Sequence, residues 1–246
     1  LWDAKTMNAN ESSYRLAIGF FLGGMTFLGL YNLFVYFSLR KRSYLYYVLS
    51  TLTFVVSQAH MYGFLFEFFG TDSFWRKPVV MLILACGWGL TSVLFAIAFL
   101  DLKRFAPRHF KLLEVTNWVY LLTPVYLMVL PMGFVTSVLT GFSLLPAGGM
   151  FSGALLRWRQ GSEEARYYAL ALGGCLVVLV PGILVNLGYF AELIYHAQML
   201  LVVAMSVYVA ILSFGLSHKL KTLQDDNLRI QIESAESLQR KVDERT

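Results

Sequence analysis

Charged residues and cysteines are both scarce in this sequence of 246 residues. Asp, Glu, Lys and Arg make up 14% of the chain, against roughly a quarter in an ordinary soluble domain. Hydrophobic residues reach 57%, and the mean hydropathy is +0.60. Two cysteines, Cys86 and Cys175, are too few for a disulfide framework. These shortages exclude a soluble enzyme, a disordered chain and a secreted disulfide-rich domain, and they predict a membrane protein.

Stretches without any charged side chain account for most of the chain, and a membrane-spanning helix needs about 20 apolar residues. Uncharged stretches cover residues 16–39, 43–66, 78–100, 115–156, 167–191 and 193–217. The fourth is twice the length of one span, and Pro131-Met132-Gly133 near its middle predicts a turn. We therefore expect an all-α bundle of seven transmembrane helices within residues 14–217. Its spans are expected over about 14–39, 44–69, 78–100, 112–131, 134–156, 167–190 and 193–217.

Lysine and arginine are distributed unequally between the two sides of this predicted bundle. Sixteen of the 20 lie in the loops and the tail on one side, and the other side has Lys5, Arg15, Arg76 and Lys77. Short cytoplasmic loops carry the excess of positive charge. The pattern predicts a multi-pass protein of the bacterial inner membrane, with the N-terminus periplasmic and the C-terminus cytoplasmic. The net charge of +5 thus indicates membrane sidedness, with the lipid bilayer as partner and no nucleic acid.

The first 13 residues are polar and lack the pattern of a secretory signal peptide. A first span that runs from outside to inside without such a signal usually follows a translocated segment. We therefore expect residues 1–13 to be the end of a missing extracytoplasmic domain or linker.

Few ionisable or amide side chains fall within or beside the predicted spans. They are His60, Glu67, Asn186, Glu192 and His196, all toward the outer side. His60 and Glu67 are seven residues apart, and Glu192 and His196 are four apart, so each pair shares one face of a helix. Together the five residues could form an outward polar pocket for a ligand, a cation or a proton. Alternatively, the glutamates are interface residues and the histidines bond to neighbouring helices. The sequence shows no catalytic or metal-ligand constellation, and we expect no cofactor.

Small residues and prolines recur inside the predicted spans. Gly19 and Gly23 are four residues apart, which favours close helix packing, and Pro146 and Pro181 fall within spans five and six. Two interpretations stay open, flexible helices or tight packing alone.

Residues 218–246 are polar, lack proline and glycine, and follow the last span without a helix stop. Positions that would face a partner helix in a coiled coil, here called the seam, recur at alternating steps of four and three residues. The pattern shifts by one residue after Ile230 and then resumes. The seam residues are Leu216, Leu220, Leu223, Asn227, Ile230, Ala235, Leu238 and Val242. This heptad spacing, with one polar seam residue, is typical of a two-stranded coiled coil. We expect a cytoplasmic signalling helix and a homodimer, the alternative being a solvated helical stub on a monomer.

Three segments together resemble a known family. Residues 29–47 read GLYNLFVYFSLRKRSYLYY, residues 165–168 read ARYY, and residues 213–220 read SFGLSHKL. An aromatic span that contains asparagine, a short basic turn and a Tyr-Leu-Tyr start to the second span resemble the bacterial seven-transmembrane receptors with diverse intracellular signalling modules. The resemblance covers nearly the whole chain from about Tyr14.

This resemblance implies an extracytoplasmic sensory domain upstream and a histidine kinase or a diguanylate cyclase downstream. We therefore expect a non-catalytic sensor segment that couples an unknown extracytoplasmic ligand, through the seventh span, to a cytoplasmic output domain. One alternative is a membrane regulator that associates with a partner sensor kinase. Another is a small-solute transporter, although internal repeats and paired intramembrane charges are not evident.

Overall fold

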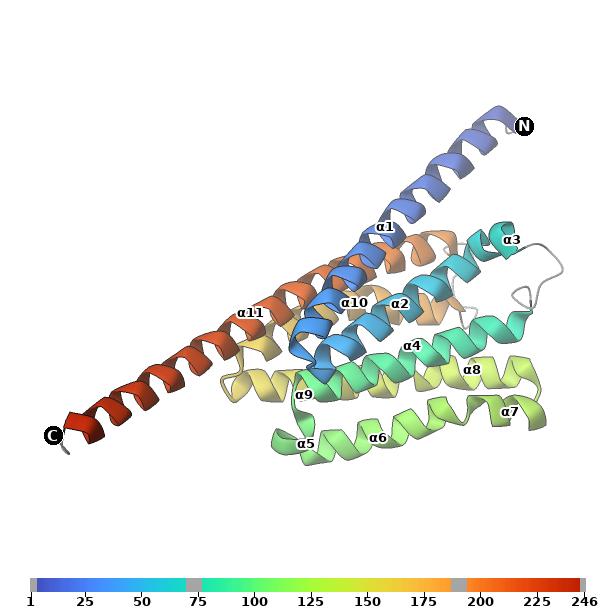
Figure 1. Ribbon diagram of the computed structural model, residues 1–246. Helices are drawn as coiled ribbons and strands as arrows, with labels where there is room; N and C mark the ends of the chain where they lie inside the picture. Colours follow the sequence, from blue (N-terminus) through green and yellow to red (C-terminus); the bar gives the residue numbers. More distant parts are fainter. Residues whose placement is uncertain (1–3, 70–76, 187–193, 244–246) are drawn as a thin grey trace.

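The computed structural model describes residues 4–69, 77–186 and 194–243, which are almost entirely helical and contain no strand. The helices are α1 (Ala4–Leu39), α2 (Arg42–Met61), α3 (Phe64–Phe69), α4 (Pro78–Phe99), α5 (Leu102–Phe105), α6 (Pro107–Leu121), α7 (Thr123–Val129), α8 (Met132–Phe142), α9 (Leu144–Arg159), α10 (Glu163–Asn186) and α11 (Ile194–Asp243). The predicted all-α class is confirmed. Figure 1 shows a bundle from which α1 and α11 project at opposite ends.

Helices that follow one another in the sequence also lie side by side in space. Contacts run from α1 to α2, then to α4, α6, α9, α10 and α11, and α11 packs back against α1. The ring is therefore closed by the first and last long helices of the chain. This arrangement gives α11 neighbours on two sides, α10 and α1.

Five helical segments of the described chain are long and apolar enough to cross a membrane. They begin or end close to the predicted bounds and cover Ser13–Leu39, Pro78–Phe99, Met132–Arg159, Glu163–Val185 and Met199–Thr222. A sixth segment, α6 with α7, qualifies as a pair bent by 47°. The remaining predicted span corresponds to α2, which is more polar. Its polar side chains Ser50, Gln58 and His60 are buried.

Most breaks in the helices lie at a proline or a glycine. Pro131 separates α7 from α8, as the sequence predicts, and Leu130 before it is extended. Three further breaks differ from the prediction. The span expected over 134–156 is interrupted at Ser143, between α8 and α9, although the two helices together still form one segment of membrane-crossing length. The span expected over 44–69 is divided at Gly63, whose φ of +81° is accessible to glycine at little cost. The span expected over 112–131 bends before Pro124, which lacks the N–H that would continue the helix.

A core of buried aromatic and aliphatic side chains joins the helices of the ring. Tyr47, Phe95, Phe99 and Tyr168 are each at most 1% exposed and come from α2, α4 and α10. The ring centroid of Phe95 lies 5.7 Å from that of Tyr47, in an edge-to-face pair, and 5.2 Å from that of Phe99, in a tilted pair. Helices that converge on such a cluster are held at fixed separations, because close-packed interiors resist small displacements.

The small residues of the predicted spans divide into two groups. A Cβ added at Gly149 would lie 3.2 Å from side chains of α6, so this glycine does allow close packing. Among the described residues nothing lies within 4 Å of the Cβ positions of Gly19 and Gly23, so these two do not mark a contact with a described helix. Helix α10 runs through Pro181 without a break, and Pro146 lies in the first turn of α9.

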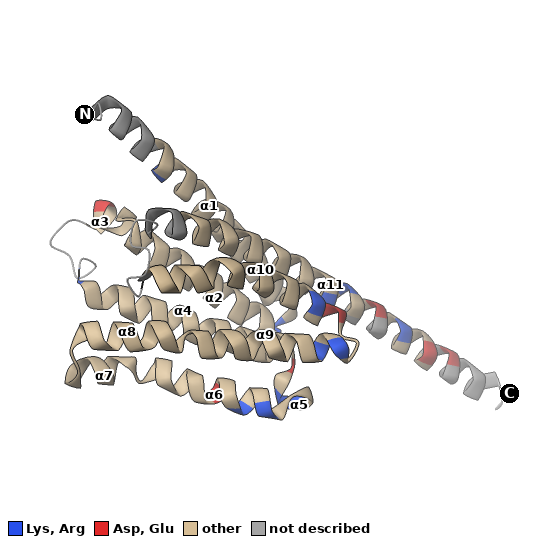
Figure 2. Ribbon diagram, turned by 180° about the vertical axis from the view of Figure 1, so that it is seen from behind, with Lys and Arg blue, Asp and Glu red and all other residues tan. Residues whose placement is uncertain are grey.

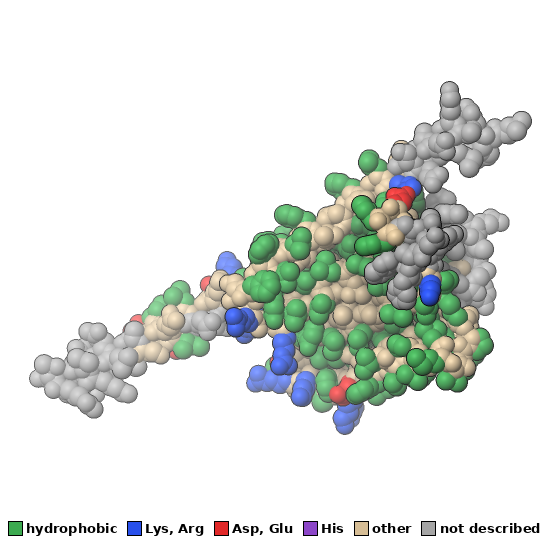
Figure 3. All heavy atoms as spheres, turned by 45° about the vertical axis from the view of Figure 1, so that its right-hand side comes forward, with side chains coloured by type: hydrophobic (Ala, Val, Ile, Leu, Met, Phe, Trp, Pro, Cys, Tyr) green, Lys and Arg blue, Asp and Glu red, His purple; other side chains and the backbone are tan. Residues whose placement is uncertain are grey.

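Basic side chains gather at one end of the bundle, as Figure 2 shows at α5, the start of α6, the end of α9 and α11 beyond the bundle. The space-filling view in Figure 3 shows a largely hydrophobic belt on the surface of the bundle, between its two ends. The exposed large side chains of this belt include Phe20, Phe27 and Phe34 on α1. An apolar belt with positive charge at one end is the pattern that membrane helices show.

Candidate functional site

The outer residues predicted to form a pocket are only partly covered by the described chain. His60 is 4% exposed at the end of α2, and its ring centroid lies 5.2 Å from that of Phe66. Glu67 lies on α3, beyond the break at Gly63. The prediction that both lie on one face of a continuous helix is therefore wrong, because the positive φ of Gly63 turns the chain.

The other three pocket residues cannot be placed in the same way. Asn186 is the last residue of α10 and His196 lies in the first turn of α11, but the side chains of both lie outside the described residues, as does Glu192. The five-residue polar pocket therefore stays a prediction. In the described part of the chain, no three His, Cys, Asp or Glu side chains are grouped to hold a metal ion.

An ion pair that the sequence did not indicate links α1 and α3 at the end of the bundle opposite the basic side chains. The guanidinium of Arg15 donates to the carboxylate of Glu67 and lies 5.4 Å from the ring centroid of Phe64. Both charged side chains are substantially exposed. The pairing joins residues 52 positions apart, so no local spacing could have indicated it.

Helix α11 continues from the bundle into the tail without interruption. It extends over Ile194–Asp243, which corresponds to about 75 Å at 1.5 Å per residue. Leu216 is fully buried and belongs to the bundle core, Leu220 is half-buried, and Ile230 is 60% exposed. A seam between two copies therefore could not include Leu216 and would begin at Leu220. The side chains of Leu223, Asn227, Ala235, Leu238 and Val242 lie outside the described residues.

Hydrogen bonds from α1 and α2 hold the part of α11 that leaves the bundle. The amide nitrogen of Asn32, itself 1% exposed, donates to Ser213 Oγ at 2.9 Å. The hydroxyls of Tyr47 and Tyr44 donate to the carbonyl oxygens of Val209 and Leu216, each at 2.8 Å. A helix carbonyl has a second lone pair, so it can accept these bonds without losing its own.

A lysine of α11 reaches the C-terminal end of α4 at the same level. Lys219 Nζ donates to the Phe99 carbonyl at 2.7 Å and lies 5.1 Å from that ring's centroid. Arg157 Nε of α9 donates a hydrogen bond to the next carbonyl, that of Leu100, at 3.1 Å. The last carbonyls of a helix lack intrahelical partners and carry partial negative charge, so both cations stabilise this end of α4.

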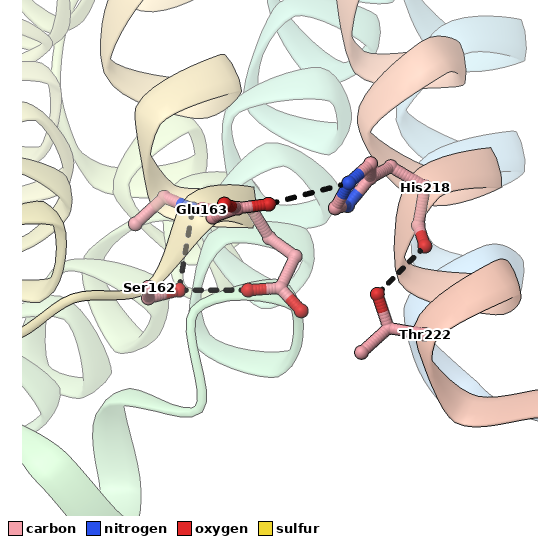
Figure 4. Close-up of polar contacts among 6 residues, drawn as sticks. Ser162, Glu163, His218 and Thr222 are labelled. Carbon is pink, nitrogen blue, oxygen red and sulfur yellow. Dashed lines mark hydrogen bonds and ion pairs between the residues drawn. The ribbon is translucent and has the colours of Figure 1, made fainter. Parts of the chain in front are cut away.

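The start of α10 completes the set of contacts around α11. His218 Nε2 lies 3.3 Å from the Glu163 carboxylate (Figure 4), and the ring of Tyr167 lies 5.7 Å from the imidazole. A Cβ added at Gly215 would lie 3.2 Å from Tyr167 Cβ and 3.5 Å from the Phe99 ring. Glycine at this position therefore allows α11 to approach α10 and α4 closely.

We name this region the exit collar; it comprises Asn32, Tyr44, Tyr47, Phe99, Glu163 and Tyr167 around residues 209–219 of α11. It brings together the three sequence segments 29–47, 165–168 and 213–220, which are far apart in the chain. These segments carry the family resemblance, but their sequences alone do not indicate that they meet. Their polar residues beside aromatic ones were the available signal.

Comparison with known proteins gives a family for nearly the same residues as the resemblance found in the sequence. The family model described as 7TM diverse intracellular signalling matches residues 14–219. The searches against curated proteins and solved structures gave no match. The matched range begins beside Arg15 and ends at Lys219, so it includes both the outer ion pair and the exit collar. The chain therefore belongs to the 7TM diverse intracellular signalling family, in which this membrane segment is a sensor and signalling module and is not catalytic.

Proposed function

We propose that this chain couples an extracytoplasmic stimulus to a cytoplasmic output domain through α11. The single observation that carries the proposal is that α11 is one unbroken helix, which the exit collar holds by hydrogen bonds and which continues beyond it. A helix held this way can pass a rotation or a displacement of the bundle to its far end. The stimulus would shift the populations of two bundle arrangements that differ at the collar.

The proposed topology has seven spans, with α2 as the span that hydropathy alone does not support. Its burial of Ser50, Gln58 and His60 supports this, because polar groups directed into a bundle need no contact with lipid. The basic end of the bundle would face the cytoplasm of a bacterial inner membrane, with the N-terminus periplasmic.

The output would come from a homodimer formed by the tail of α11. Leu228, Ile230 and Ile232 are apolar yet 51–60% exposed on a helix outside the bundle, and Ile230 falls on the heptad seam, which supports a partner along this part of α11. The proposed seam comprises Leu220, Leu223, Asn227, Ile230, Ala235, Leu238 and Val242. A paired tail would set the relative position of two output domains, each a histidine kinase or a diguanylate cyclase.

Disulfide crosslinking of the full-length receptor in native membranes tests this assembly. Leu220→Cys and Leu223→Cys are expected to form covalent homodimers on mild oxidation. Asp225→Cys is the matched control, because it lies on the same helix opposite the seam. Equal crosslinking at all three positions, or none at the seam, would contradict the homodimer. Crosslinking to a different chain would instead support association with a partner sensor kinase.

A further inference from the structure

A cavity lies inside the ring, among α4, α6, α9, α10 and α11. Its wall includes Trp88, Tyr120, Met150, Cys175, Met205 and Tyr208. The cavity has a volume of about 90 Å³. A single water needs only about 10–15 Å³ of such space. The space is therefore several times what one water needs and suits only a small organic molecule.

Several polar atoms of the wall already have a hydrogen-bond partner. Ser92 Oγ is hydrogen-bonded to Ser50 Oγ at 2.8 Å, and Ser143 Oγ donates to the Thr140 carbonyl at 2.6 Å. The Cys175 thiol lies 3.4 Å from Met205 Sδ and donates to it. A buried water needs two to four polar partners, which these groups do not offer. The rest of the wall consists mostly of aromatic, thioether and aliphatic side chains, the last including Val93, Pro146 and Leu179, and such a wall favours apolar, polarisable groups.

Two of the wall residues belong to α11, just inside the exit collar. Met205 and Tyr208 are three residues apart and thus share a face of the helix. Val209, the next residue, accepts the hydrogen bond from Tyr47, and the Tyr208 ring lies 6.3 Å from that of Tyr168. Any occupant of the cavity would therefore contact the helix that the collar holds.

We propose that this cavity is a binding site for a small apolar molecule, aromatic or short-chain, that partitions into the bilayer. Occupancy favours the arrangement of the bundle in which the cavity is open and so biases α11. This second part rests on the proposed function of α11, whereas the binding itself does not. The site differs from the predicted outward polar pocket in both chemistry and residues.

Photolabelling of the full chain in lipid nanodiscs with phenyl(trifluoromethyl)diazirine, followed by peptide mass spectrometry, tests the binding. Saturable labelling is expected at Met150, Met205 or Tyr208, and excess toluene should reduce it at least fivefold. Labelling at lipid-facing Phe214 should not saturate. Ala147 is 5% exposed in the cavity wall, so Ala147→Phe should abolish the saturable labelling. Leu145→Phe, two residues away and 46% exposed, is the matched control and should leave it unchanged.

The smaller variant Ala147→Met covers the case in which Ala147→Phe fails to fold, since it fills less of the cavity. Wall labelling that is absent, that rises in proportion to the probe as at Phe214, or that survives both substitutions would overturn the site. Toluene should also change the crosslinking rate of Leu220→Cys at least twofold. Saturable labelling with an unchanged crosslinking rate would keep the site and contradict its coupling to α11. Loss of labelling with intact crosslinking would contradict the site and leave the proposed relay standing.

Discussion

The two ends of the bundle are held together in different ways. At the outer end the exposed Arg15–Glu67 ion pair joins α1 to α3. At the exit collar, buried hydrogen bonds and a close helix approach join α11 to α1, α2, α4 and α10. Exposed ion pairs contribute little and are screened by salt, whereas packed interfaces resist small displacements. The end that carries the ion pair is therefore expected to yield more easily than the exit collar.

The largest effect is expected from filling the close approach at the exit collar. Gly215→Leu should lower the free energy of unfolding by about 1–3 kcal/mol, because the new side chain meets Tyr167 and Phe99. SDS titration of the detergent-solubilised chain measures this. Gly174→Leu is the matched control on α10, since a Cβ there has no neighbour within 4 Å. Equal losses in the two variants would contradict the close packing at Gly215.

A smaller effect is expected from the buried Asn32–Ser213 hydrogen bond. Asn32→Leu should cost about 0.6 kcal/mol of unfolding free energy, the average for hydrogen bonds between membrane helices, and at most about 1.7 kcal/mol. A double-mutant cycle with Ser213→Ala isolates the pair. Thr26→Ala serves as control, because Thr26 Oγ1 donates to a carbonyl of its own helix, that of Leu22, at 2.8 Å. A coupling energy of zero between Asn32 and Ser213 would show that the contact does not hold α11.

The smallest effect on stability is expected at the outer ion pair. Glu67→Gln should lower the free energy of unfolding by at most about 1 kcal/mol at low salt, and the difference should shrink as ionic strength rises. Membrane insertion should be unchanged while the signalling response of the full-length receptor changes. A loss of unfolding free energy larger than that of Gly215→Leu, or a loss that does not depend on salt, would contradict the difference between the two ends of the bundle.

Much of the helical layout could be predicted from the sequence, because uncharged runs and one proline turn are local signals. Charge-free stretches located most of the helices, and Pro131 marked the turn between α7 and α8. The break at Gly63 was not predicted, since glycine in an apolar run is compatible with a continuous helix. The bend before Pro124 was missed for a similar reason: the apolar stretch continues on both sides of it.

The candidate site was less predictable, because its contacts join residues far apart in the chain. Asn32 bonds to a residue 181 positions away, and Tyr44 to one 172 positions away. Helical spacing relates residues three or four apart and is silent on such pairs. The family resemblance pointed to the correct segments without indicating that they meet. Leu216 fitted the heptad pattern equally well as a seam residue, and only the packing of α10 and α1 around it shows that it is core.

The continuity of α11 between the collar and the tail is the central claim, and a single distance measurement tests it most directly. Spin labels at Val207→Cys and Leu228→Cys, both exposed positions, should be separated by about 32 Å along an unbroken helix of 21 residues. Double electron–electron resonance on the full chain in nanodiscs, with Cys86 and Cys175 replaced by alanine and unlabelled chain in excess, measures this distance. The account predicts one narrow distribution centred there. A broad distribution, or one with a substantially shorter mean, would contradict it.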